Sequence, residues 1–191
     1  LAMIERWPDW PARVIAITGP EGSGKSHLAS IWALMSGARV MSARALQTAT
    51  LPEALATGAL VLENCGEGAV EERALFHLLN LVREQEGYLL MTGRSVPALW
   101  DVALPDLASR LRAVPAIAVA VPDDVLLRAV MVKLFADRQL AVDETLIAYL
   151  LTRVGRSFAA ARAAVQTLDR EALQRKRPVN RALAAELFRD G

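Results

Sequence analysis

Residues 14–26 read VIAITGPEGSGKS, an apolar run followed by a glycine-rich loop that ends in lysine and serine. The loop fits the pattern G-x-x-x-x-G-K-[ST], which indicates phosphate binding when a strand precedes it and a helix follows. Val14–Thr18 is an unbroken apolar run, as in a buried parallel strand, and Gly24–Met35 has a helical pattern. The stretch therefore predicts a phosphate-binding loop in an α/β domain.

Each part of this loop has a chemical reason. Glycines let the backbone curl, so that its N–H groups and the positive end of the next helix face phosphate oxygens. Lys25 reaches the β- and γ-phosphates, and the Ser26 hydroxyl is a ligand for Mg²⁺. A glycine-rich turn with an exposed lysine is the alternative, and the strand–helix context disfavours it. The expected nucleotide-binding residues of the loop are Gly19, Pro20, Glu21, Gly22, Ser23, Gly24, Lys25, Ser26 and His27.

Four further runs, mostly apolar, predict strands. They are Arg39–Ser42, Leu60–Glu63, Tyr88–Thr92 and Ala116–Val121. Helical patterns lie between them, at Val70–Glu86 and Leu104–Arg112. Strand–helix alternation predicts a three-layer α/β domain with a five-stranded parallel sheet and right-handed crossovers.

The pattern changes at Pro122, beyond which no strand is expected. Helix caps are expected at Asp123 or Asp124, at Asp143, at Ser157 and at Asn180. We therefore expect two domains, a nucleotide-binding base at residues 1–121 and a small all-helical lid at residues 122–191.

Composition excludes several classes of protein. Hydrophobic residues make up 53% of the 191, which is enough for a sizeable core, and the 22 Lys+Arg nearly balance the 21 Asp+Glu. A dedicated nucleic-acid binder usually has a basic excess. One cysteine, Cys65, excludes an internal disulfide framework and suits a reducing cytoplasm. We expect it to be a small packed residue, because no histidine partner is visible for a nucleophile.

Three further features carry weaker signals: the two histidines, the longest apolar stretch, and the tryptophans Trp7 and Trp10. His27 and His77 have no cluster of cysteines or carboxylates at ligand spacing, so a metal site made of side chains alone is not expected. The longest apolar stretch, Val114–Val121, is too short to span a membrane. Trp7 and Trp10, in WPDWP, are expected to pack against the nucleotide-binding domain rather than to contact the heterocyclic base of a bound nucleotide.

Five segments resemble the AAA+ ATPases and, within them, the DnaA-type replication initiators. In chain order they read GPEGSGKSHLA, LVLEN, LLMTGRSVPALW, LPDLASRL and VGRSFAAARAAV. The resemblance covers nearly the whole chain, although the DNA-binding helices of the initiators have no counterpart in it. It implies an AAA+ fold, binding of ADP or ATP with Mg²⁺, and similarity to short members of the family that regulate the initiator.

The resemblance also implies roles for individual residues. Glu63 and Asn64 fall where the family carries acids at the end of the third strand. Glu63 can help Ser26 to hold Mg²⁺, whereas Asn64 cannot activate a water as a carboxylate does, so weak intrinsic hydrolysis is expected. Arg110, in ASRLR, matches the arginine finger that acts in trans on a neighbouring subunit's nucleotide. Arg156, in VGRSF, matches the lid arginine that contacts the nucleotide's phosphates.

The residues alone leave other interpretations open. Arg110 would by itself indicate no more than a surface helix arginine. Arg156 stands at a helix start, where its charge opposes the helix dipole, so a phosphate or another partner is needed to explain it. Residues 92–94 lie in the sensor region after the fourth strand, and Arg94 there is either solvated or contacts a phosphate or a neighbouring subunit.

Two classes of function follow. The first is a regulator that binds adenine nucleotide and supplies Arg110 to stimulate ATP hydrolysis by the initiator DnaA, together with the sliding clamp of DNA polymerase. The family's clamp-binding peptide lies near the N-terminus and is expected to precede this sequence. The second class is a self-contained P-loop ATPase or a small-molecule kinase.

A helicase-loader-like AAA+ protein would differ from the regulator mainly in its partner. We expect no sequence-specific DNA binding and no membrane association, whereas self-association stays open because a finger implies an interface.

Overall fold

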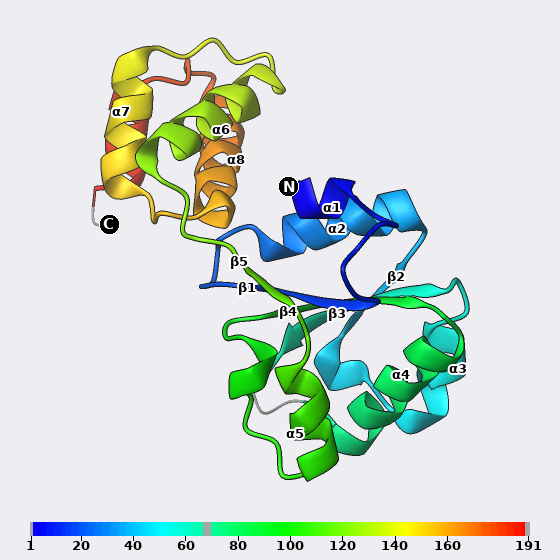
Figure 1. Cartoon of the computed structure of the whole chain (residues 1–191). Helices are drawn as coiled ribbons and strands as arrows, with labels where there is room; N and C mark the ends of the chain where they lie inside the picture. The colour runs from blue at the N-terminus through cyan, green and yellow to red at the C-terminus, as the bar shows by residue number, and fades with distance from the viewer. Residues whose placement is uncertain (1, 67–69, 190–191) are drawn as a thin grey trace. The chain divides into compact units, whose positions relative to one another are not determined.

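The computed structural model describes residues 2–66 and 70–189, and the chain divides into two compact units. The first unit comprises Leu1–Pro20 and Lys25–Val119, and the second comprises Glu21–Gly24 and Ala120–Gly191. Figure 1 shows the helices and strands of both units. Each unit has its own hydrophobic core. The second unit differs from the expected lid because it includes four residues of the glycine-rich loop.

A five-stranded parallel sheet forms the centre of the first unit, as the sequence predicts. Its strands are β1 (Val14–Thr18), β2 (Arg39–Ser42), β3 (Ala59–Cys65), β4 (Tyr88–Gly93) and β5 (Ala116–Ala118). They lie in the order β2-β3-β4-β1-β5, and all neighbours are parallel. The carboxyl ends of β1, β3 and β4 therefore share one edge of the sheet.

The last strand is shorter than expected. It ends at Ala118 rather than Val121, because its pairing partner β1 ends at Thr18 and Val119 N donates the last hydrogen bond to Thr18 O.

Helices cover both faces of this sheet. They are α1 (Ala2–Glu5), α2 (Lys25–Ser36), α3 (Leu51–Ala54), α4 (Glu72–Glu84) and α5 (Pro105–Arg112), with 3-10 turns η1 (Ala43–Ala45), η2 (Thr48–Thr50) and η3 (Pro97–Leu99). Side chains alternate between the two faces of a strand. On β1, Ala16 packs in the core that includes Leu78 of α4, whereas Ile15 and Ile17 pack with Trp32 of α2. Figure 1 shows α2 on one face of the sheet and α4 and α5 on the other.

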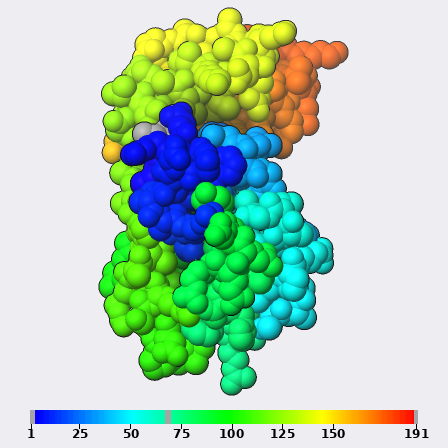
Figure 2. Space-filling model, turned by 45° about the vertical axis from the view of Figure 1, so that its right-hand side comes forward, coloured from blue at the N-terminus to red at the C-terminus, as the bar shows by residue number. Residues whose placement is uncertain are grey.

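The WPDWP segment before β1 packs against the base, as expected. Trp10 stacks on Trp32 with ring centroids 4.8 Å apart, and its Nε1 donates to Met3 O at 2.8 Å. Trp7 and Trp10 both meet Tyr88 edge-on, at 5.8 and 5.9 Å between centroids. Figure 2 shows this N-terminal segment in dark blue beside the light blue of α2.

The described residues of the second unit form four helices. They are α6 (Asp124–Ala136), α7 (Glu144–Arg153), α8 (Phe158–Arg175) and α9 (Arg181–Leu187). Each begins at an expected cap, because Asp123, Asp143, Ser157 and Asn180 all accept a hydrogen bond from the backbone N–H three residues on. Among the described residues, none of the helices combines the length and the apolar character needed to cross a bilayer.

Candidate nucleotide-binding site

The glycine-rich loop joins the end of β1 to the start of α2. Gly22 and Gly24 have φ of 76° and 97°, which residues with a Cβ rarely adopt. Lys25 Nζ donates to Gly19 O at 2.8 Å and to Pro20 O at 2.7 Å, so the lysine side chain folds back over the loop. The first turn of α2 contains no acidic residue, and the positive end of its dipole is therefore not neutralised from within the helix.

Ser23, in the middle of this loop, has a buried hydroxyl that lacks a partner. The residue is 2% exposed, and its Oγ has no hydrogen bond to any described residue. Leaving a buried polar group unsatisfied costs about 1–3 kcal/mol. A phosphate oxygen would accept a hydrogen bond from this hydroxyl, so the loop fits a phosphate-bearing ligand. Ser26 and His27 are exposed at the start of α2.

Glu63 and Asn64 lie at the carboxyl end of β3, where the strand contains a bulge. The bulge separates two regular pairs with β4, Leu62–Met91 and Cys65–Gly93, so β3 has one extra residue there. Asn64 has φ of 61°, a left-handed conformation that asparagine tolerates better than most residues. Glu63 is half-buried and Asn64 is exposed.

Thr92 holds this bulge in place from the neighbouring strand. Its side chain is 1% exposed, and its Oγ1 accepts a hydrogen bond from Asn64 N at 3.1 Å. Sequence reasoning placed Thr92 in the sensor region but missed this bond, because a bulge leaves no pattern in a short apolar run. Arg94 follows the end of β4 and is exposed.

Ser26 and Glu63 are the residues that could hold Mg²⁺ beside bound phosphates. Both belong to the carboxyl edge of the sheet, where open α/β sheets bind their ligands. Mg²⁺ usually binds through one or two protein oxygens, several waters and substrate phosphates, so a hydroxyl with one carboxylate is a suitable set. Within the described part of the chain, no group of three or more His, Cys, Asp or Glu residues could hold a metal ion.

The start of α8 contacts the loop residues that belong to the second unit. Phe158 N donates to Gly22 O at 3.3 Å, and a Cβ on Gly22 would lie 2.3 Å from Ser157 Cβ. Arg156 directly precedes this contact. Its Nη2 lies 2.9 Å from Asp124 Oδ2, in a pair whose side chains are 65% and 52% exposed. Asp124 thus supplies one explanation for an arginine that opposes the helix dipole.

Arg110 lies elsewhere, at the amino edge of the sheet. It occupies the last turn of α5, and the next strand, β5, begins a few residues later at this edge. Its guanidinium carbon stands 4.6 Å from the centre of the Phe76 ring on α4. Arg110 therefore lies at the opposite edge of the sheet from Gly19, Lys25 and Ser26, the loop residues that belong to the first unit.

Cys65 is a packed residue, as expected. It is 0% exposed, and its thiol donates to Leu62 O at 3.4 Å. Burial raises the pKa of the Cys65 thiol to about 12, so the reactive thiolate does not form near neutral pH.

No protein-family model matches the chain, and no curated protein matches it. Solved structures do match. Domain III of the replication initiation protein DnaA from Thermotoga maritima superimposes with a TM-score of 0.75 at 16% identity, over 99% of this chain and 88% of that one. Replication initiator DnaA bound to AMPPCP and single-stranded DNA gives 0.65 at 22% identity, over 85% and 58%. The RuvB Holliday junction branch migration motor from Thermotoga maritima gives 0.71 at 16%, over 90% and 59%.

At these low sequence identities, the similarity to the solved structures concerns the fold alone. The first unit with its loop, followed by the helical unit, defines an AAA+ P-loop fold. Within that class, the fold is of the type seen in DnaA. The chain spans 58% of the length of the DnaA chain solved with AMPPCP.

Proposed function

We propose that this chain binds adenine nucleotide in its glycine-rich loop and regulates the start of chromosomal DNA replication. In this proposal it stimulates ATP hydrolysis by a DnaA-type initiator, together with the sliding clamp. It would then resemble the short regulatory member of the DnaA family called Hda, the regulatory inactivator.

The loop carries the nucleotide-binding part of the proposal. Ser23 has a buried hydroxyl without a partner among the described residues, and Lys25 donates to two main-chain oxygens of the loop. Phosphates would replace these oxygens as stronger, charged acceptors. Ser26 and Glu63 would hold Mg²⁺, which neutralises phosphate charge. A matching DnaA chain was solved with AMPPCP, an adenine nucleotide analogue, which favours adenine nucleotide for this loop as well.

The residues at the carboxyl edge of the sheet favour binding of ATP over its hydrolysis. Asn64 stands where the family carries an acid, and an amide cannot take a proton from an attacking water. The bulge also fixes the backbone of this residue through Thr92. Slow intrinsic hydrolysis is therefore part of the proposal.

Arg110 carries the regulatory part. Its position away from its own loop leaves the guanidinium for the γ-phosphate of another subunit, where an arginine finger accelerates hydrolysis by about 10³–10⁵. Arg112 is on the same helix, two residues on and exposed, and provides a matched control.

Nucleotide binding is tested by titrating ADP and ATP into the full chain and into Lys25→Ala. We expect at least a tenfold loss of affinity in Lys25→Ala and none in Lys133→Ala, which removes an exposed lysine on α6. Equal affinity in all three proteins would refute nucleotide binding at the loop.

Regulation is tested by hydrolysis of ATP bound to a DnaA initiator, with clamp and DNA present. We expect stimulation by the wild type and by Arg112→Ala, and its loss in Arg110→Ala with nucleotide affinity unchanged. Absence of stimulation, alongside brisk ATP hydrolysis or phosphoryl transfer by the chain itself, would return it to the self-contained P-loop enzymes. Stimulation of a helicase-loading reaction instead would identify a different partner.

A further inference from the structure

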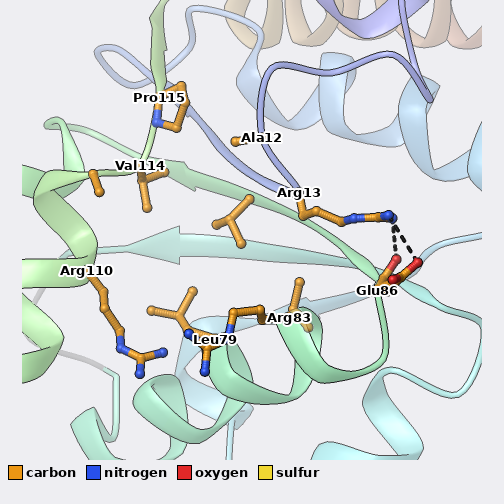
Figure 3. Close-up of a pocket in the computed structure, with 11 residues that line it drawn as sticks. Ala12, Arg13, Leu79, Arg83, Glu86, Arg110, Val114 and Pro115 are labelled. Carbon is orange, nitrogen blue, oxygen red and sulfur yellow. Dashed lines mark hydrogen bonds and ion pairs between the residues drawn. The ribbon is translucent and has the colours of Figure 1, made fainter.

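A pocket of about 510 Å³ opens at the amino edge of the sheet, between α4, the end of α5 and the segment before β1 (Figure 3). Its walls are mainly apolar and include Val14, Leu79, Val82 and Val114. Val14 is the first residue of β1, whereas the glycine-rich loop follows the last one, so the pocket and the loop lie at opposite ends of this strand. Pockets of this size are typical of ligand sites.

Three arginines line the pocket, and they differ in how their charge is balanced. Arg13 donates to the backbone oxygen of Glu86 and lies 3.4 Å from its carboxylate. Neither Arg83 nor Arg110 forms an ion pair within residues 2–66 and 70–189. In Figure 3 these two side chains extend toward one another from α4 and α5, while Arg13 extends away toward Glu86.

The stacking of Arg110 on Phe76 leaves the edge of its guanidinium for an acceptor. The cation lies over the ring face, at 4.6 Å from the ring centre, so its N–H groups point outward in the plane of the guanidinium. Arg83 is exposed on α4, two helical turns after Phe76 and therefore on the same side of the helix. The pocket thus combines apolar walls with two cations that have no counterion among the described residues.

We propose that this pocket is a docking site for a protein segment that carries acidic side chains next to a large apolar one. The apolar side chain would be buried against Leu79, Val82 and Val114, where each Å² of apolar surface removed from water contributes about 25 cal/mol. Carboxylates of the same segment would bind Arg83 and Arg110, because arginine binds carboxylates through two parallel hydrogen bonds.

The charges of Arg83 and Arg110 and the apolar walls of the pocket favour this class of ligand over two others. A basic segment would be repelled by the charges of Arg83 and Arg110. A nucleotide would also bring ribose hydroxyls and further phosphate oxygens against apolar walls that offer few donors besides Arg83 and Arg110, which is costly. The inference goes beyond the proposed function but shares Arg110 with it, and Arg110 would bind either a carboxylate of the segment or the γ-phosphate of another subunit at one time. Arg83 and the apolar walls belong to the pocket alone, so Arg83→Glu tests the pocket without changing the proposed finger.

A selection from a random dodecapeptide display library on the full chain tests the proposal. Counter-selection uses Arg83→Glu, which reverses one charge, and Ala113→Phe, which places a large side chain at the exposed rim of the pocket. Arg73→Glu and Ala56→Phe are the matched controls, because both positions are exposed in the first unit and outside the pocket. Circular dichroism and nucleotide affinity show that each variant is folded.

We expect the selected peptides to be rich in Asp and Glu beside Leu, Phe or Trp. Their affinity falls at least tenfold in Arg83→Glu and in Ala113→Phe and stays unchanged in both controls. The proposal would be overturned if the selected peptides were basic or were not enriched over the pocket variants. It would also be overturned if the controls lost as much peptide affinity as the pocket variants. Arg83→Glu changes an exposed side chain and decides the outcome by itself if Ala113→Phe fails to fold.

Discussion

The backbone N–H of Asn64 donates to the Thr92 hydroxyl at 3.1 Å, and this bond joins β3 to β4 at the point where their regular ladder is interrupted. A bulge leaves one residue without its ladder partner. Here a side chain replaces the missing carbonyl. Asn64 and Thr92, which the sequence places at the ends of the third and fourth strands, are therefore connected directly, and Thr92 has a structural task.

Replacing Thr92 tests that task. Thr92→Val keeps the shape of the buried side chain but removes the acceptor, so the Asn64 amide loses its hydrogen bond and the free energy of unfolding falls by about 1–2 kcal/mol. Thr92→Ser keeps the hydroxyl and serves as the control. Amide hydrogen exchange separates the two, because protection of the Asn64 amide should disappear in Thr92→Val and persist in Thr92→Ser. Equal protection in both would show that another group holds the bulge.

Asn64→Asp restores an acid at the site where the proposed function expects weak turnover. Aspartate also tolerates the left-handed backbone, so the fold should be retained. We expect intrinsic ATP hydrolysis to rise by at least tenfold, towards the range of about 10²–10⁴ that a well-placed base contributes. Asn64→Ala is the control, since it changes the side chain without adding an acid. An unchanged rate in Asn64→Asp would mean that other residues limit hydrolysis.

The elements that could be predicted from the sequence are those with a strong local cause. The loop between β1 and α2 follows from glycine spacing after an apolar strand, and Asp143 and Ser157 begin helices because their side chains bond the next turn. The strands of this parallel sheet are short runs that are mostly apolar, and four of the five could be placed within one or two residues. In each of these cases the local sequence is sufficient to predict the element.

The features that were missed depend on contacts far along the chain. Helices of four residues, α1 and α3, have no stability of their own and exist through packing. The bulge at Asn64 depends on Thr92, 28 residues away. The pocket at the amino edge draws its walls from three separate segments, so Arg83 and Arg110 come to line the same pocket only through the fold.

The pair between Arg156 and Asp124 gives a test of the proposed role of Arg156. Both side chains are more than half exposed, so the pair contributes little to stability. If Arg156 binds phosphate, as the resemblance to the family implies, Asp124 competes with the nucleotide for it. Asp124→Asn should then tighten ATP binding by about 2–5-fold, corresponding to the ~0.5–1 kcal/mol of an exposed pair, and leave the melting temperature nearly unchanged.

A double-mutant cycle makes this conclusion specific. Arg156→Ala should weaken ATP binding, and Asp124→Asn should have no further effect once Arg156 is absent. The affinities of the wild type, both single variants and the double variant are measured by titration calorimetry. The same effect of Asp124→Asn with and without Arg156 would place Arg156 outside the nucleotide site.

Cys65 predicts a dependence of stability on alkaline pH. Burial raises the pKa of this thiol to about 12 in the folded chain, and the charge of Glu63 raises it further while a hydrogen bond from the Thr92 backbone opposes the rise. The unfolded chain releases the same proton near its ordinary value of 9.0. Between these two values the folded state binds more protons, so the free energy of unfolding falls as the pH rises.

The size of this effect follows from the two pKa values. Below pH 9 the protonated thiol contributes its full stabilisation. Between pH 8 and ~10.5 the free energy of unfolding of the wild type should fall by about 2 kcal/mol more than that of Cys65→Ala, at about 1.4 kcal/mol per pH unit. Denaturant unfolding of both proteins at the two pH values measures the difference. Thiol labelling should agree, because a buried neutral thiol reacts only when the chain opens. An equal loss in both proteins, or rapid labelling of the native chain at pH 8, would show that the thiolate forms without unfolding.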